Sequence, residues 1–135
     1  MKVLVPTDGS EHAMRAVQRA VEMAEKLGAE VTLMSVVPVS DFDDMTPNIR
    51  EKVEKEAKDI LEKAKALFAA KNLPVTAVLE KGLVPANNIL RKAEEEKFDR
   101  IVMGSTGATG LVRILMGSTA AKVVAHAPCE VTVVR

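Results

Sequence analysis

Short apolar runs alternate with longer amphipathic stretches along this 135-residue chain, and this alternation limits the possible folds more than any other feature of the sequence. Residues 3–5 and 101–103 contain no polar side chain, which is typical of strands that are buried on both faces of a sheet. Where strands alternate with helices, the chain forms βαβ units, and these units build parallel sheets. The sequence therefore predicts an α/β fold around a parallel sheet.

The alternation divides into nine elements. Ser10 is a typical N-terminal helix cap and Gly28 a typical helix stop. Between these two residues, apolar side chains recur at steps of three and four, as they do on one face of a helix. A chain of this length makes one domain, residues 1–135. We expect strands at residues 3–5, 31–37, 75–79, 101–103 and 130–134, and helices from Ser10 to residue 27 and at 48–71, 86–93 and 118–126.

The charge and the aromatic content argue against nucleic acid as a partner. The chain has 19 basic and 19 acidic residues, so it has no net field that would attract a polyanion or an anionic membrane. It has three Phe and no Trp or Tyr, whereas proteins that bind single strands stack the bases on aromatic side chains. We therefore expect neither a nucleic-acid partner nor a membrane partner.

Cys129 is the only cysteine, which excludes an intrachain disulfide and a zinc site made of several cysteines. We interpret Cys129 as a packing residue. His12 and His126 are too few for a metal site, and we interpret them as surface or helix-cap residues. The apolar run at residues 3–5 is too short for a signal peptide or a membrane span, so we expect a cytoplasmic protein.

A glycine-rich segment follows the expected strand at 101–103. Gly104, Gly107 and Gly110 are spaced three residues apart, and glycine allows a ligand to lie close against the backbone. Main-chain amides that point into such a concavity bind anions, and a helix that begins near Ser118 adds its own N–H groups and dipole. The segment therefore predicts a phosphate-binding site. Hydroxyl groups that can donate to phosphate oxygens belong to Ser105, Thr106, Thr109, Ser118 and Thr119.

Three other nucleotide-binding motifs do not fit this segment. A Walker A loop requires Lys directly after its second glycine, and no Lys lies between residues 98 and 121. The dinucleotide pattern G-x-G-x-x-G fails because Thr106 stands where the second glycine would be. The first loop lacks the Ser-Gly-Gly-x-Asp-Ser signature of the ATP pyrophosphatases. The remaining pattern is Gly-x2-Gly-x9-Gly-Ser, at Gly104, Gly107, Gly117 and Ser118.

This glycine pattern resembles the ATP-binding branch of the universal stress protein family, and the resemblance extends over the whole chain. Residues 3–10, Val-Leu-Val-Pro-Thr-Asp-Gly-Ser, are similar to the first strand and loop of the family. Gly82 with Pro85, residues 98–105 and residues 127–129 are similar to later parts of its pattern. The resemblance implies an adenine-nucleotide alpha hydrolase-like fold, a single-domain three-layer sandwich whose five parallel strands lie in the order 3-2-1-4-5.

In that order, strands 1 and 4 are neighbours whose connections leave in opposite directions, and open α/β sheets bind ligands at such a switch point. The resemblance implies that the backbone near Val36 contacts adenine, that Pro6 lines the adenine slot, and that Asp8 lies near the ribose or a phosphate-bound metal. It also implies that the glycines line the ribose and phosphate path and that Ser118 and Thr119 contact the phosphates. The complete expected binding set is Pro6, Thr7, Asp8, Val36, Met103, Gly104, Ser105, Thr106, Gly107, Ala108, Thr109, Gly110, Gly117, Ser118 and Thr119.

Three of these residues also have simpler interpretations. Val36 can be a core residue of its strand. Asp8 can bond the amides of its own turn, and Ser118 can be the N-cap of the last helix while it contacts a phosphate. No catalytic constellation is evident in the sequence. Ser118 and His126 would lie about 12 Å apart along one helix, which is too far for a Ser–His pair.

The resemblance implies a stress-response or signalling module that binds ATP, ADP or AMP, with Mg²⁺ or Mn²⁺ reaching the site through the phosphates. One alternative is an enzyme, either a slow ATPase or a phosphoryl or nucleotidyl transferase. Another is a dimeric interaction protein that binds no nucleotide. The strand at 130–134 is an apolar sheet edge, and similar family members dimerise through it, so we expect a homodimer. Glu130 stands where the family commonly has Pro, which can weaken or shift that pairing.

Overall fold

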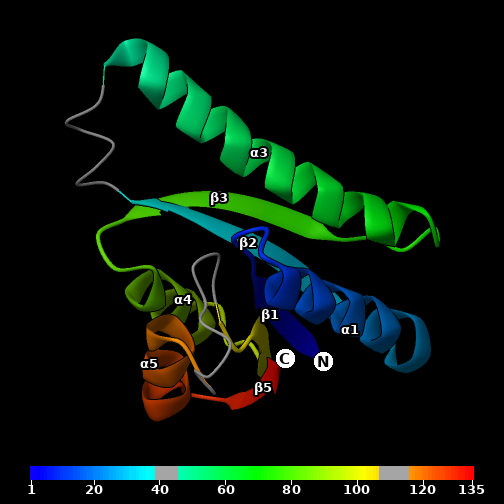
Figure 1. The fold of residues 1–135 in the computed structure, drawn as a ribbon. Coiled ribbons are helices and arrows are strands. Elements are labelled where there is room, and N and C mark those ends of the chain that lie inside the picture. Colours follow the sequence, from blue (N-terminus) through cyan, green and yellow to red (C-terminus); the bar gives the residue numbers. More distant parts are fainter. Residues whose placement is uncertain (39–45, 107–115) are drawn as a thin grey trace.

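Strands and helices alternate along the chain in the computed structural model, which describes residues 1–38, 46–106 and 116–135 (Figure 1). Each of the expected elements is present, close to its expected bounds. None of the described helices combines the length and the apolar character that a membrane crossing requires. The elements are β1 (Lys2–Pro6), α1 (Glu11–Leu27), β2 (Glu30–Pro38), α3 (Pro47–Ala69), β3 (Thr76–Gly82), α4 (Pro85–Glu95), β4 (Arg100–Gly104), α5 (Ser118–His126) and β5 (Glu130–Val134).

The five strands form one parallel sheet in the order β3-β2-β1-β4-β5. The predicted fold class and strand order are therefore confirmed. β1 lies at the centre, where Val3 pairs with Val31 of β2 on one side and with Arg100 of β4 on the other. The connections from β1 and β4 leave in opposite directions, so the carboxyl ends of these two strands form the switch point of the sheet.

Helices cover both faces of the sheet and produce three layers (Figure 1). α1 and α3 lie against one face, and α4 and α5 lie against the other. Neighbouring residues of a strand point to opposite faces, so Val3 and Val5 pack into the α1/α3 core while Leu4 packs into the α4/α5 core. All three side chains are fully buried, which explains why this strand reads as an unbroken apolar run.

α1 begins and ends at the residues that the sequence indicates. The Ser10 hydroxyl accepts a hydrogen bond from the Ala13 N–H at 3.3 Å, which caps the first turn. Gly28 follows the last turn in the left-handed conformation, with φ of 66°, and its N–H donates to the carbonyl of Ala24. The first cap fixes where the helix after β1 begins, and so it places the N-terminus of α1 beside the switch point.

Two boundaries differ from the expected ones. α3 begins at Pro47 because the Thr46 hydroxyl caps it by accepting from the Ile49 N–H at 3.4 Å, and proline suits the first helical position. β3 continues to Gly82, three residues beyond its expected end, because Gly82 still pairs with Pro38 at the end of β2. The carboxyl end of the sheet is therefore longer on the β2–β3 side than the apolar pattern predicts.

The edge strand β5 begins with an acidic residue, Glu130. The Glu130 carboxylate forms an ion pair with Arg100 of β4, with 2.5 Å between Oε2 and Nη2. The two residues are also register partners in the β4–β5 pair. The Glu130 side chain is largely exposed, so the pair contributes only about 0–1 kcal/mol. Glu130 therefore supports, modestly, the attachment of β5 to its own sheet.

Candidate functional site

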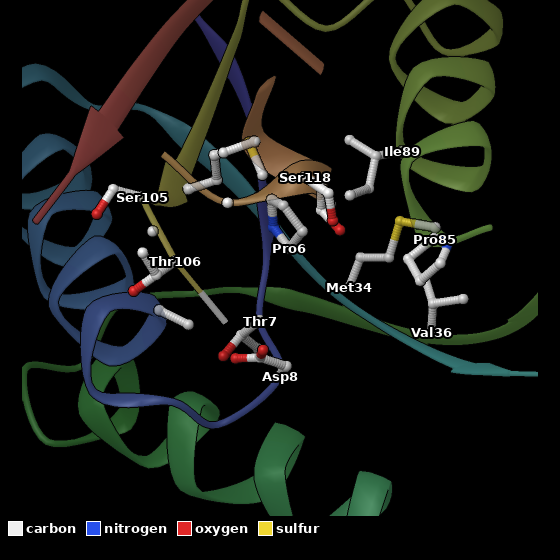
Figure 2. Close-up of a pocket in the computed structure, with 16 residues that line it drawn as sticks. Pro6, Thr7, Asp8, Met34, Val36, Pro85, Ile89, Ser105, Thr106 and Ser118 are labelled. Carbon is white, nitrogen blue, oxygen red and sulfur yellow. The ribbon is translucent and has the colours of Figure 1, made fainter. Parts of the chain in front are cut away.

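A pocket of about 610 Å³ lies where β1 and β4 end, at the switch point of the sheet (Figure 2). This volume is in the usual range of small-molecule sites, roughly 300–1,000 Å³. Residues from β1, β2 and β4 and from the N-terminal parts of α1, α4 and α5 contribute to it. The lining residues are Pro6, Thr7, Asp8, Ala13, Met34, Val36, Pro85, Ile89, Met103, Gly104, Ser105, Thr106, Gly117, Ser118, Thr119 and Ala120.

One half of the pocket is apolar. Met34 and Val36 of β2 lie beside Pro85 and Ile89 of α4, and Figure 2 shows these four side chains gathered on one side. Residues 34 and 36 share a sheet face because side chains alternate along a strand. Residues 85 and 89 share a helix face because they are about one turn apart. An apolar slot of this kind suits a flat, weakly polar group such as a purine base.

The other half of the pocket carries hydroxyl groups. Thr7 and Asp8 follow β1, and Ser105 and Thr106 follow β4 (Figure 2). Ser118 is the first residue of α5 and also lines the pocket. Hydroxyls donate hydrogen bonds, and the N-terminus of a helix carries partial positive charge. This half therefore suits an anionic group.

The start of α5 differs from one sequence interpretation. Gly117, not Ser118, is the N-cap, and it supplies no side-chain cap to the first turn. The Gly117 N–H donates to the Ser105 carbonyl at 2.6 Å, which ties the start of α5 to the end of β4. The interpretation of Ser118 as the N-cap is wrong because α5 begins at Ser118 itself, one residue earlier than that role requires. The Ser118 side chain lines the pocket instead.

Asp8 bonds its own turn and also lies at the pocket. Its Oδ1 accepts a hydrogen bond from the Ser10 N–H at 2.9 Å, so the carboxylate does bond its own turn. Its side chain is also exposed and lines the pocket. Asp8 is the only charged residue in the described part of the lining. An anion bound here would therefore be held by N–H and O–H donors of that part rather than by a basic side chain.

Gly104 lines the pocket, as expected, and the structure gives a further reason for glycine at this position. A Cβ on Gly104 would lie 2.7 Å from the Ala13 nitrogen and 2.8 Å from the His12 carbonyl carbon. The first turn of α1 thus packs directly against the backbone at the end of β4. Only a residue without a side chain permits this approach.

His12 contacts the site although sequence reasoning missed it. Its Nδ1 lies 2.7 Å from Oγ of Ser105 and 3.1 Å from Oγ1 of Thr106. The His12 side chain is half-buried and hydrogen-bonded in the first turn of α1, but its contact with two pocket residues was not predicted. The partners are 93 and 94 residues away in the sequence, so no local pattern reveals the contact. The available signal was the strand order, which places the segments that follow β1 and β4 side by side.

The structure brings eleven of the fifteen expected binding residues into the lining of this pocket. The other four, residues 107–110, lie outside the described residues. The alternation of side chains along β2 links Met34 to Val36, so Met34 could have been inferred. The lining residues of α4 could not be inferred from the sequence, because their place depends on how that helix packs on the sheet. The lining residues that were not expected are Ala13, Met34, Pro85, Ile89 and Ala120.

Cys129 does not line the pocket. It is half-buried and packs against the α4/α5 core, in agreement with its interpretation as a packing residue. Burial raises the pKa of the Cys129 thiol, and the carboxylates of Asp99 and Glu130 raise it further. A raised pKa leaves little reactive thiolate at neutral pH. The geometry therefore gives no support to thiol chemistry at this residue.

Comparison with known proteins decides the family. The family model described as "Universal stress protein family" matches residues 1–135. This chain belongs to the universal stress protein family. Universal stress protein MJ0531 from Methanocaldococcus jannaschii is 39% identical to it over 99% of this chain and 81% of the relative. Universal stress protein YxiE from Bacillus subtilis is 34% identical over 99% of this chain and 98% of the relative.

Solved structures of similar proteins have the same fold as this universal stress protein. The structure of hypothetical protein MJ0577 aligns with a TM-score of 0.86 and 31% identity, over 98% of this chain and 94% of that chain. A universal stress protein solved in complex with cAMP aligns with a TM-score of 0.77 and 25% identity, over 100% of this chain and 97% of that chain. The sequence resemblance to this family is therefore confirmed at the level of family and fold.

Proposed function

We propose that the pocket at the switch point binds an adenine nucleotide, which is ATP, ADP or AMP. The observation that supports this most directly is the division of the pocket into an apolar half and a half with hydroxyl and main-chain donors. A nucleotide has the same division, between its base and its phosphates. The location agrees with the rule that open α/β sheets bind ligands where the strand order reverses.

The proposed placement follows the two halves. The base lies in the apolar half, against Pro6 and near the main chain of Val36. The ribose lies near Asp8, and the phosphates lie near Ser118, where the helix terminus favours negative charge. Residues 107–110, which lie outside the described residues, belong to the same proposed binding set.

A related protein supports this choice of ligand. The universal stress protein that is 25% identical to this chain was solved in complex with cAMP. Adenine, ribose and one phosphate are common to cAMP and ATP. A pocket with an apolar half for the base and a half with hydroxyl groups for the phosphate can therefore accept either nucleotide. ATP would place two more phosphates in the half that carries the hydroxyl groups.

In this proposal a divalent cation enters with the phosphates. Mg²⁺ is typically bound by one or two carboxylates together with substrate phosphates and water. Asp8 supplies one carboxylate at the pocket, and over residues 1–38, 46–106 and 116–135 no cluster of three His, Cys, Asp or Glu side chains is placed to hold an ion. The residues present thus fit a Mg²⁺ or Mn²⁺ ion shared between Asp8 and the nucleotide, rather than an ion held by the protein alone.

We further propose that the protein acts in the cytoplasm as a stress-response or signalling module. Nucleotide binding would select the conformation or the partner of the protein. The half of the pocket that carries the hydroxyl groups joins the segments that follow β1 and β4 to the start of α5. A ligand that touches all three segments shifts the molecule toward the arrangement that it binds best. The edge strand β5 is the proposed contact for a homodimer.

A negative charge at the start of α5 tests the proposed site. Ser118→Glu places a carboxylate where the phosphates are proposed to lie, while an acidic residue in the first turn suits the helix dipole. Ala121→Glu is the matched control, because Ala121 is an exposed residue of the same helix that does not line the pocket. Calorimetric titration with ATP and MgCl₂ is expected to show binding weakened about tenfold or more, ~1.4 kcal/mol, by Ser118→Glu alone.

Two results would contradict the proposal. One is that the wild-type protein binds none of ATP, ADP and AMP at millimolar concentration, and the other is that both Glu variants bind ATP equally. Mass spectrometry of the denatured protein, as purified, provides an independent check for bound nucleotide. Phosphate release that tracks the purified protein and is lost in Asp8→Ala would instead favour the slow ATPase.

A further inference from the structure

His12 links α1 to the end of β4 through two hydroxyl groups. Its Nδ1 lies 2.7 Å from Oγ of Ser105 and 3.1 Å from Oγ1 of Thr106. Both hydroxyl residues line the pocket, whereas the half-buried His12 is not among the lining residues. The imidazole therefore contacts the pocket wall from outside the pocket.

Ser105 is tied to three elements. Its N–H donates to the Val134 carbonyl at 2.8 Å, and its carbonyl accepts from the Gly117 N–H at 2.6 Å. These bonds hold its backbone between β5 and the start of α5. Its side chain is held to α1 by His12, and the residue is only 2% exposed. The His12 contact thus sets the direction of the Ser105 hydroxyl, which the backbone bonds leave open.

The contact depends on the close approach of α1 to the end of β4. A Cβ on Gly104 would lie 2.8 Å from the carbonyl carbon of His12 and 3.0 Å from its Cβ. Glycine at this position lets the His12 backbone come within reach of the two residues that follow Gly104. The short distance between these two backbones is an observation independent of the hydrogen bonds, and it points to the same arrangement.

We propose that His12 is a positioning residue of the nucleotide pocket, one that directs the Ser105 and Thr106 hydroxyls toward a phosphate group. The inference rests on the proposed function. Nδ1 presents either one hydrogen or one lone pair. With the hydrogen on Nδ1, the ring donates to the Ser105 oxygen, and the Ser105 hydroxyl hydrogen is directed to an anionic acceptor. A pocket with no basic side chain in its described lining depends on donors that are aimed in this way.

Two substitutions at His12 distinguish this role from simple packing. Asparagine places its amide nitrogen close to the position of Nδ1 and donates in the same way, whereas leucine has a comparable size and no donor. We expect His12→Leu to weaken ATP binding about tenfold, the effect of one or two ordinary hydrogen bonds. His12→Asn is expected to remain within about threefold of the wild type. Adenosine, which has no phosphate, is expected to bind all three proteins equally.

Three further variants complete the experiment. His126→Leu makes the same chemical change at an exposed residue in the last turn of α5 that does not line the pocket. Ser105→Ala removes the hydroxyl that His12 holds, and it is expected to reproduce the phosphate-specific loss. The His12→Leu/Ser105→Ala double variant is expected to be no weaker than His12→Leu alone, because His12→Leu already removes the His12–Ser105 contact that Ser105→Ala removes. Circular dichroism and urea unfolding verify that each variant is folded.

The outcomes separate this inference from the function on which it rests. If the wild-type protein binds no adenine nucleotide, both are wrong. If the wild type and His12→Leu bind ATP equally well, this inference is wrong and the nucleotide function stands. Equal losses of ATP and adenosine binding in His12→Leu would also overturn it, because they would indicate a packing role. If His12→Leu does not fold, His12→Asn and Ser105→Ala decide the question by the same comparison of ATP with adenosine.

Discussion

Gly104 packs against the first turn of α1 and also lines the pocket. The backbone atoms of Ala13 and His12 lie so close that an added Cβ would stand 2.7 and 2.8 Å from them. Backbone atoms cannot rotate away, so the first turn of α1 would have to shift. We expect Gly104→Ala to lower the free energy of unfolding by about 1–3 kcal/mol, measured by urea denaturation.

Gly82 provides the control for this prediction. An added Cβ there would lie 1.9 Å from Oδ1 of Asn88, which belongs to a side chain rather than to the backbone. The cost of Gly82→Ala is therefore expected to fall when Asn88 is also replaced by alanine, since the clash then disappears. No side-chain truncation on α1 should relieve Gly104→Ala. A loss below about 0.5 kcal/mol for Gly104→Ala would show that α1 moves away easily.

Single residues differ in how far the sequence reveals their roles. Ser10 and Gly28 could be assigned from local chemistry, because a helix cap depends on the few residues next to it. Asp8 and Ser118 could be placed at the pocket because the family resemblance implies that one lies near the ribose or a metal and the other near the phosphates. His12 could not be assigned, because its role arises from a contact with residues more than ninety positions away.

At the scale of elements, the N-terminus of α1 supports one wall of the pocket. Its cap is the Ser10 hydroxyl, which accepts from the Ala13 N–H at 3.3 Å. We expect Ser10→Ala to lower the free energy of unfolding by about 1 kcal/mol, because the N–H loses its partner. Ser10→Asp keeps an acceptor at the cap and is expected to restore most of the stability. Thermal or urea unfolding measures both, and equal losses in the two variants would contradict the capping role.

The strands show why element bounds are harder to predict than element types. β1 is an unbroken apolar run because both of its faces are buried, so its type could be read directly. β3 extends past its apolar residues through Glu80 and Lys81. The Glu80 carboxylate accepts hydrogen bonds from Asn88 at 3.0 Å and from Arg91 at 2.8 Å, both on α4. Polar residues remain in this strand because a neighbouring helix satisfies them, which periodicity alone cannot reveal.

At the scale of the whole molecule, β5 is an open edge of the described sheet. Its partner in the sheet is β4, and β3 forms the opposite edge. The valines at 131, 133 and 134 are only partly buried. Exposed apolar side chains on an edge strand, beside main-chain groups without a sheet partner, favour pairing with a second chain. This supports the proposal of a homodimer through β5.

One hydrogen bond identifies which main-chain N–H and C=O groups of β5 point away from the sheet. The Val134 carbonyl accepts from the Ser105 N–H, so it faces the side of β4. In a parallel sheet, the N–H and C=O of one residue point to the same side, and successive residues alternate. The N–H and C=O of Val133 therefore point away from β4, toward the position of a partner strand.

We expect the wild-type protein to be a homodimer and Val133→Pro to be a monomer, because proline has no N–H to donate to the partner strand. The change leaves the β4–β5 bonds in place, since Val133 directs its N–H outward. Val133→Thr keeps the N–H and nearly the same shape, and it is expected to remain dimeric. Sedimentation equilibrium measures the mass of each protein at the same concentration. A dimeric Val133→Pro would place the contact elsewhere on the molecule, and a monomeric wild type would rule out the β5 interface.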